Sequence, residues 1–385
     1  MYYSYTKKIL LIVFNTLILF SIINFFVDPE QVYPKLFPID KPVLSDFSKE
    51  LTLSKYGILN EFNNLNERDR KKALAIFSKD ADCAIIGSSH VMQISSFSED
   101  KSLTEYCKSI INLGVSGGTL EDYFAFSNML LENKHAVSTI VFGIDPWSLK
   151  FNSDHRWNHI KSDFDKMKNR QRITQQYPNA SYTVSLILNL INLEYLIESL
   201  NKLTSEDRLE DKDKDKETLK HAEKFDHNKG ISGTSVTLPD GSWAYSTEYI
   251  NKRKLLMKTF GGMNNYKISR LDGEAVVPGT EGLVRWYDDD AINDFTNLIK
   301  LLQSKFNVLF VMTPYHPKVW EQQQPTVEAM KSIENKIHML AKQLNITVIG
   351  SYNPVKIGCS KDEFFDGMHG TPKCLIKLER KIVKN

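Results

Sequence analysis

Five short apolar runs, each followed by small or polar residues, constrain the fold of this chain most. Their length and composition are typical of buried strands in a parallel sheet. Segments with helical spacing of apolar residues lie between them, at 120–132, 291–304 and 325–344. The apolar runs are CAIIG (Cys83–Gly87), SIINLG (Ser109–Gly114), STIVFGI (Ser138–Ile144), VLFVMT (Val308–Thr313) and ITVIGS (Ile346–Ser351). This alternation predicts an α/β fold in which helices cover both faces of an open parallel sheet.

The amino terminus adds an apolar run without a charged residue, from Ile9 to Val27. At about 1.5 Å per residue, a helix over this run spans roughly 28 Å, enough to cross the hydrocarbon core of a bilayer. Lys7 and Lys8 precede the run and Asp28 follows it, so the positive-inside tendency predicts a cytoplasmic amino end and an extracytoplasmic remainder. A cleaved signal peptide is the alternative, but Asp-Pro-Glu-Gln stands where a small-residue cleavage site is needed.

Three segments follow from these patterns. Residues 1–28 are expected to form a cytoplasmic tip and transmembrane anchor, 29–78 a Pro-containing linker, and 79–385 an α/β domain with an insertion at about 150–285. Within the insertion, Val184–Leu200 is apolar but interrupted by Asn and Glu, which favours a buried or membrane-adjacent helix over a second span. Ser205–Asp226 mixes charges of both signs densely and is expected to be a solvated loop or frayed helix. The whole chain has 49 Lys+Arg against 47 Asp+Glu, so its net charge gives no reason to expect nucleic acid as a partner.

Polar motifs follow the first three predicted strands. Gly87-Ser88-Ser89-His90 follows the first, where a turn before a helix can expose a serine hydroxyl; capping of that helix by Ser88 and Ser89 is the alternative. The glycine-rich stretch 112–119 follows the second and can turn backbone N–H groups toward a ligand. Gly143-Ile144-Asp145-Pro146-Trp147 follows the third. Because the carboxyl ends of parallel strands share one sheet edge, these motifs are expected to form one site.

Asp366-Gly367-Met368-His369, after the fifth strand, completes the pattern. An Asp three residues before a His can hold one ring nitrogen and leave the other to take a proton from a hydroxyl. Together, the order of these four motifs resembles that of the SGNH/GDSL hydrolase superfamily. The anchor, Gly-Ser-Ser and Gly-x-Asp-Pro-Trp are similar to a membrane-anchored branch that includes alginate O-acetylation and lipoteichoic-acid D-alanylation proteins.

The resemblance implies a three-layer α/β/α domain and a role for each matching residue. Ser89 would be the nucleophile, with His369 as its base and Asp366 orienting that base. The N–H groups of Ser89 and Gly117 would form the oxyanion hole. Asp145 stands at the oxyanion-hole position where many members carry Asn. An ionised carboxylate there repels an oxyanion, so Asp145 must be protonated, turned away or engaged with another donor.

Further residues near this edge remain open to two interpretations. Trp147 is either a core aromatic or a wall for a sugar ring. Tyr315 and His316 either line the pocket or belong to a turn that Pro314 and Pro317 stabilise. His90 is an alternative base, although its position next to Ser89 in the chain makes it a poor partner for that serine.

The implied activity is extracytoplasmic acyl transfer to a bacterial cell-envelope or exported polysaccharide, with a membrane-bound O-acyltransferase as a partner. No metal or organic cofactor is needed. A carbohydrate esterase, which removes the acyl group, and a non-catalytic glycan-binding or assembly protein are the alternatives.

Four cysteines lie on the predicted extracytoplasmic side, where disulfides are permitted. Cys359 and Cys374 flank the Asp366/His369 loop, and a bridge between them would contribute on the order of 3 kcal/mol and fix that loop. Cys83 is either simply buried in its strand or bridged to Cys107.

Overall fold

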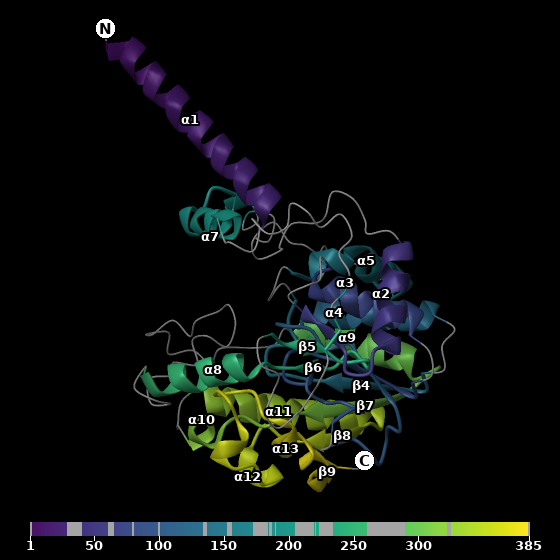
Figure 1. The fold of residues 1–385 in the computed structure, drawn as a ribbon. Coiled ribbons are helices and arrows are strands. Elements are labelled where there is room, and N and C mark those ends of the chain that lie inside the picture. The colour runs from purple at the N-terminus through teal and green to yellow at the C-terminus, as the bar shows by residue number, and fades with distance from the viewer. Residues whose placement is uncertain are drawn as a thin grey trace. The chain divides into compact units, whose positions relative to one another are not determined.

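The computed structural model has two compact units, Met1–Pro38 with Thr174–Thr218 and Ile39–Ile173 with Leu219–Asn385 (Figure 1). The residues that it describes are 2–28, 41–60, 65–78, 81–98, 101–133, 137–151, 156–171, 184, 187, 188, 190–204, 219, 221, 222, 234–259, 289–321 and 325–383. The expected charged loop at 205–226 therefore lies almost entirely outside the described residues.

The first unit contains the amino-terminal apolar helix. Helix α1 covers Tyr2–Val27, and its stretch Tyr5–Val27 is long and apolar enough to cross a membrane. Helix α7 covers Leu193–Thr204 within the expected insertion. Part of that insertion thus belongs to the same unit as the anchor.

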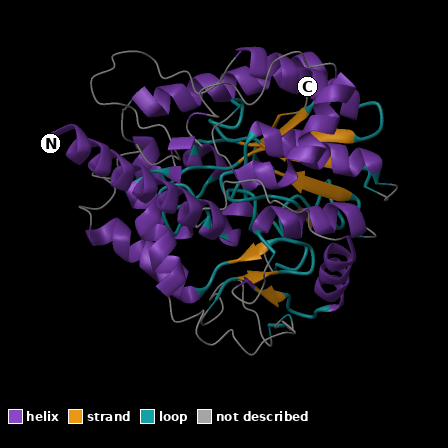
Figure 2. Cartoon of the chain, turned by 90° about the horizontal axis from the view of Figure 1, so that it is seen from above, coloured by secondary structure: helices purple, strands orange, loops and turns teal. Residues whose placement is uncertain are grey.

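A mostly parallel sheet forms the centre of the second unit (Figure 2). Its strands lie in the order β3-β2-β4-β7-β8-β9. Their bounds are β2 Cys83–Ile86, β3 Ile110–Asn112, β4 Thr139–Gly143, β7 Asn307–Met312, β8 Thr347–Gly350 and β9 Ile382–Val383. The first five are the predicted strands, and they pair in parallel. The sixth, β9, was not predicted and pairs antiparallel with β8. The mixed α/β architecture is confirmed, and the expectation of a purely parallel sheet is wrong at this edge.

Long helices cover one face of the sheet. They are α4 (Leu120–Glu132), α9 (Asp289–Leu302) and α11 (Pro325–Leu344), close to the three predicted helices. Alternate strand residues point toward them, as the pleat requires. Phe142 of β4 and Phe310 of β7 contact Phe295 of α9, with ring centroids 5.5 and 5.8 Å apart.

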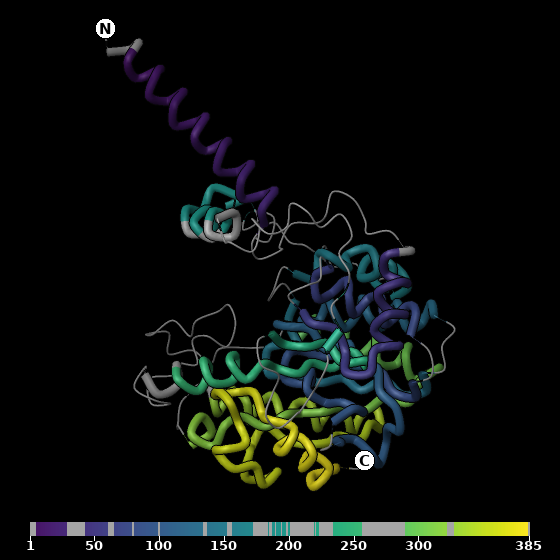
Figure 3. Tube along the Cα trace, viewed as in Figure 1, coloured from purple at the N-terminus to yellow at the C-terminus, as the bar shows by residue number. Residues whose placement is uncertain are grey.

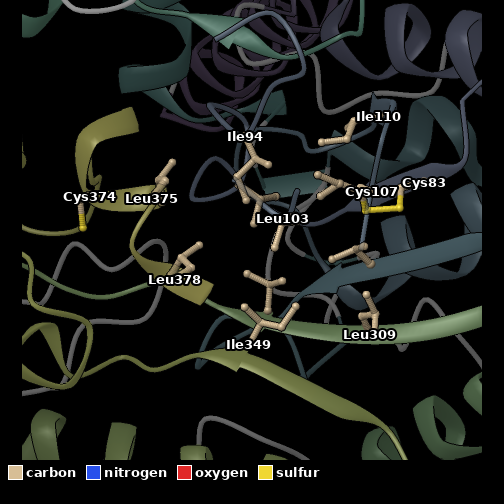
Figure 4. Packing of buried hydrophobic residues seen from close by; sticks show 14 of the residues in the cluster. Cys83, Ile94, Leu103, Cys107, Ile110, Leu309, Ile349, Cys374, Leu375 and Leu378 are labelled. Carbon is tan, nitrogen blue, oxygen red and sulfur yellow. A yellow bond between two sulfur atoms is a disulfide. The ribbon is translucent and has the colours of Figure 1, made fainter. Parts of the chain in front are cut away.

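Turns and short helices cover the opposite face, where helices were also expected. The other strand residues, among them Ile85, Val141 and Leu309, pack there in a buried apolar cluster (Figure 4). Ile94, Leu103 and Cys107 contribute to it from the segment after β2, and Cys374, Leu375 and Leu378 from the carboxyl-terminal segment. Two disulfides, Cys83–Cys107 and Cys359–Cys374, cross-link these two segments, one disulfide in each. The segments are therefore held in shape by covalent bonds as well as by backbone hydrogen bonds.

The segment between α1 and β2, expected at 29–78 to be a linker leading into a helix, is folded over much of its length. Residues 41–60 and 65–78 are folded into the second unit, as α2 (Lys41–Leu53), β1 (Ile58–Leu59) and α3 (Glu67–Phe77). Arg68 of α3 forms a buried ion pair with Asp122 of α4 at 2.7 Å. Residues 29–40 lie outside the described ranges.

The remaining elements include a small three-stranded sheet and further helices. β1 pairs antiparallel with β5 (Val236–Thr237), which pairs with β6 (Trp243–Ala244). The other helices are α5 (Lys161–Gln171), α8 (Thr247–Thr259), α10 (Pro317–Glu321), α12 (Pro354–Ile357), α13 (Pro372–Leu375) and 3₁₀ turns at Arg156–Ile160, Lys361–Glu363 and Leu378–Arg380. In Figure 3, α8 runs alongside the yellow carboxyl-terminal segment, to which an ion pair joins it.

Candidate active site

Ser89, His369 and Asp366 form a continuous chain of polar contacts. Oγ of Ser89 lies 2.9 Å from Nε2 of His369. Nδ1 of His369 lies 2.8 Å from Oδ2 of Asp366 and 3.0 Å from Oδ1. Ser89 directly follows β2, and the other two residues lie in the loop before α13. Asp366 is buried, whereas Ser89 is partly exposed. The hydroxyl is therefore within reach of a ligand, and its neighbouring base is oriented by a carboxylate.

Besides the ring of His369, four N–H groups hold the Asp366 carboxylate. The backbone N–H groups of Met368 and His369 donate to Oδ1 at 2.9 and 2.8 Å. Nε and Nη2 of Arg253, in α8, donate to Oδ2 at 3.0 and 2.7 Å. Burial alone would raise the pKa of Asp366, but His369, Arg253 and the backbone donors outweigh it and lower that pKa. Asp366 is therefore a carboxylate at neutral pH, as an orienting residue must be.

The glycine-rich turn packs against the turn that carries Ser89. Backbone N–H of Val115 donates to the carbonyl of Gly87 at 3.0 Å. A Cβ at Gly118 would lie 2.5 Å from that same carbonyl oxygen and 3.0 Å from Cα of Ser88, so only glycine permits the approach. Gly117 has a φ of +57°. The turn thus lies beside the nucleophile turn, while the roles of the Ser89 and Gly117 N–H groups stay predictions.

Glu67 anchors the same turn from α3. Its carboxylate accepts hydrogen bonds from the backbone N–H of Ser116 at 2.8 Å and from the Ser116 hydroxyl at 3.3 Å. Sequence reasoning missed this contact because it placed Glu67 in a linker.

Asp145 lies next to His90, the residue that the sequence left as an alternative base. Oδ1 of Asp145 lies 3.2 Å from Nδ1 of His90, and the same nitrogen lies 3.2 Å from Oγ1 of Thr313. His90 is buried, and burial together with the nearby His369 lowers its pKa well below the usual value. The two side chains are thus in close contact, and which of the three expected arrangements Asp145 adopts stays a prediction. A direct part for Asp145 in the oxyanion hole stays a prediction.

The other pocket residues divide into two groups. Trp147 and Tyr315 contact the His90 ring, with centroids 5.3 and 5.4 Å away, and the His90 ring lies 5.1 Å from that of His369. His316 instead supports the loop that carries Asp366 and His369, because its backbone N–H donates to the carbonyl of Gly367 at 3.0 Å. Its ring packs against Phe364, 5.4 Å away. Tyr315 is 1% exposed, which favours the turn over a pocket-lining position for that residue.

Three residues near the site were not predicted from the sequence. Arg253 lies 113 residues from Asp366 in the chain, and no motif marks it. Gln93 donates through Nε2 to the carbonyl of Gly370 at 2.8 Å. Phe365 stacks on His369 at a ring-centroid distance of 5.3 Å; its place next to Asp366 is the one available signal. Within the described residues, no three His, Cys, Asp or Glu side chains gather in a group that could hold a metal ion.

A scan of protein-family models and a search of curated proteins found no match to this chain. The functional assignment therefore depends on the sequence motifs and the geometry of the site.

Proposed function

We propose that this chain is an SGNH-type serine acyltransferase, acting outside the cytoplasmic membrane on acyl esters, most simply acetyl esters, of a bacterial cell-envelope or exported polysaccharide. The observation that carries the proposal is the Ser89–His369–Asp366 chain of contacts, at 2.9 and 2.8 Å. Ser89 lies 280 residues from His369 in the chain, and an ordinary helix cap at Ser89 would not require a histidine–carboxylate pair.

The strand order supports an SGNH-like domain. Counting the parallel strands β2, β3, β4, β7 and β8 along the chain, their spatial order is 2-1-3-4-5. In such a sheet the strand order reverses between the first and third strands, because later strands are added on the other side of the first. Ligands bind outside the carboxyl ends of the strands at this point. Ser89 follows the first of these strands and Asp145 the third.

The chemistry follows from the contacts. His369 accepts the Ser89 proton as Oγ attacks the acyl carbonyl carbon. The oxyanion of the tetrahedral intermediate accepts hydrogen bonds from the backbone N–H groups of Ser89 and Gly117. Collapse breaks the ester bond, and His369 returns its proton to the departing oxygen. A sugar hydroxyl then attacks the acyl-serine as His369 takes its proton. Collapse breaks the bond between the acyl group and Oγ, His369 returns the proton to Ser89, and the acylated sugar leaves. These steps use protein groups alone.

The first test identifies the nucleophile in the full chain in detergent. Ser89→Ala should lower acyl-ester turnover by at least about a thousandfold and abolish labelling by a fluorophosphonate. Ser88→Ala is the matched control and should retain labelling, because the Ser88 hydroxyl accepts a hydrogen bond from the His90 N–H and has no base beside it. Labelling of the Ser89→Ala protein would contradict the assignment.

The product distinguishes transfer from hydrolysis. Incubation with an acyl ester and a glycan acceptor should yield acylated glycan; release of free acid in its place would identify the esterase alternative. An unlabelled wild-type protein that binds glycan would identify the non-catalytic alternative. A membrane-bound O-acyltransferase that supplies the acyl group is the partner we propose.

A further inference from the structure

The apolar segment at 184–200 leaves large side chains uncovered in the first unit. Val184, Ile187, Leu188, Leu193 and Ile197 are each at least 50% exposed. No Lys or Arg interrupts the segment. A water-facing helix of this composition would expose an unusual apolar area.

Polar side chains bind this segment to the carboxyl end of α1. Nδ2 of Asn24 donates to the carbonyls of Leu190 and Asn192 at 2.9 and 3.3 Å. The Ser199 hydroxyl donates to Oδ1 of Asn24 at 3.1 Å, and the Tyr195 hydroxyl donates to Asp28. Asn24 is fully buried. The segment is therefore held at one level along α1.

We propose that the segment at 184–200 lies in the outer membrane–water interface, with its exposed apolar side chains against lipid. This inference rests on the proposed span of α1. Asn24 lies three residues before the end of the apolar helix, a rise of about 5 Å. A segment bonded at that depth cannot stand clear of the bilayer, and burial of an apolar face at the acyl–headgroup boundary is the usual position of amphipathic helices. The absence of basic residues suits the outer leaflet.

The test measures the depth of single nitroxide labels on the full chain in phosphatidylcholine/phosphatidylglycerol vesicles. Ile197→Cys and Leu193→Cys report on the segment, Leu11→Cys on the span, and Met339→Cys, in an exposed part of α11, on water. All four native cysteines are in disulfides, so only the introduced thiol is labelled. We expect labels at 193 and 197 to be more accessible to oxygen than to a water-soluble nickel chelate, at a shallower depth than the label at 11.

Three results would overturn the inference. Labels at 193 and 197 that match the aqueous Met339→Cys label, with the Leu11→Cys label in lipid, would place the segment in water. Protection of both labels from oxygen and nickel alike would show that protein covers the segment, as a second copy or another partner would. An aqueous Leu11→Cys label would remove the span itself, and with it the premise.

Independently, we infer that Arg253 is a positioning residue for Asp366. Two hydrogen bonds from its guanidinium end on Oδ2, the oxygen that also lies 2.8 Å from Nδ1 of His369. The guanidinium therefore fixes the carboxylate rotation that His369 depends on. Arg253 also joins α8 to the loop between β8 and α13 that carries Asp366. The order of Ser89, His369 and Asp366 therefore depends on the position of α8. This inference rests on the proposed acyl-transfer activity.

Arg253→Met is the decisive variant, with Arg253→Lys as the conservative one and Lys254→Met, an exposed neighbour on α8, as the matched control. We expect Arg253→Met to lower kcat at least about tenfold, less than loss of the carboxylate itself, with KM little changed. The acid limb of the pH–rate profile should move to higher pH, because the Arg253 cation disfavours proton uptake at the site and its removal lifts that effect. Arg253→Lys should recover part of both effects.

An Arg253→Met enzyme with normal kcat and an unmoved acid limb would overturn this role. So would a loss shared by Lys254→Met, which would indicate damage to α8 alone. If Ser89→Ala retains activity in the same assay, it is the proposed function that fails.

Discussion

At the scale of single residues, Ser89, His369 and Asp366 are expected to behave as one unit. His369→Ala should be as damaging as Ser89→Ala, because the hydroxyl then has no base, and the double variant should be no worse than either. Asp366→Asn should be milder, since the imidazole keeps a neighbour but faces an amide that favours the wrong tautomer. The activities of these four variants are compared with that of the wild type by initial rates with a small acyl ester. Additive losses in the double variant would contradict a shared step.

His316 is expected to make folding sensitive to acid. Burial, aided by Lys318, lowers its pKa to about 4, and its Nδ1 accepts a hydrogen bond from the Lys318 backbone N–H. In the unfolded chain the pKa of this histidine is about 6.5. At a pH between these two pKa values, the unfolded chain binds a proton here that the folded chain does not. The free energy of unfolding therefore falls as the pH is lowered through this range. Buried His90 acts in the same direction.

His316→Asn isolates this contribution, because the amide oxygen can still accept from the same N–H. Thermal unfolding of both proteins at about pH 7 and about pH 4.5 should show a smaller loss of Tm for the variant. An equal loss would assign the acid sensitivity to other groups. Activity should be retained at neutral pH, since the His316 ring packs on Phe364 and its backbone supports Gly367.

Sequence reasoning found the residues that motifs mark and missed those that only the fold brings near. Ser89, Asp366 and His369 could be predicted because each stands at a fixed offset from a strand end or from another motif residue. The Arg253–Asp366 ion pair has no such offset. Nor has the contact between His90 and Asp145, which follows from the adjacency of β2 and β4.

At the scale of elements, the five parallel strands were predictable because each is a continuous apolar run, buried on both faces. The two-residue strands β1, β5, β6 and β9 are too short to show a period. Helix α3 was hidden for another reason: Arg68, Asp69, Arg70 and Lys71 are consecutive charged residues, yet all are buried. Such a run indicates a solvated segment unless its tertiary partners, such as Asp122, are known.

The two disulfides should stabilise the fold to a similar extent but differ in their effect on activity. Their sequence separations are 24 and 15 residues, so removal of either should cost on the order of 3 kcal/mol of stability. Gly370, next to His369, packs against the Cys359–Cys374 bridge, since a Cβ built on Gly370 would lie 3.2 Å from Sγ of Cys374. Replacing Cys359 and Cys374 by Ala should therefore also lower kcat by loosening the His369 loop.

The Cys83→Ala/Cys107→Ala pair is the matched control, because Cys107 lies in the covering of the sheet face rather than beside His369. Tm and kcat measured on both double variants separate the two effects. Equal kcat values at equal Tm would show that the Cys359–Cys374 bridge has no part in the site.

At the scale of the whole molecule, chain order predicted the sheet but not the division into units. The pattern of Val184–Leu200 indicated a buried or membrane-adjacent helix, and this much could be taken from its apolar content. Its attachment to α1 depends on Asn24 and Ser199, two neutral polar residues without any motif. Long-range side-chain hydrogen bonds of this kind leave no periodic signal, so the unit formed by the anchor and part of the insertion could not be foreseen.

The last prediction concerns the side of the membrane on which the second unit folds. Lys7 and Lys8 should hold the amino end in the cytoplasm. Alkaline phosphatase fused after Asn385 should then be active, because it requires export, and β-galactosidase fused there should not. Lys7→Glu/Lys8→Glu should reduce the exported fraction.

Both disulfides give a second measure of the same orientation, because they persist only in an oxidising compartment. In cells quenched with an alkylating reagent, the wild type should show no reactive cysteine before reduction. In the charge-reversed variant, the fraction with four reactive cysteines should match the fraction that loses phosphatase activity. A wild-type chain with reactive thiols and a silent phosphatase would place the second unit in the cytoplasm. Full phosphatase activity in a shed, shortened chain would instead indicate cleavage after α1.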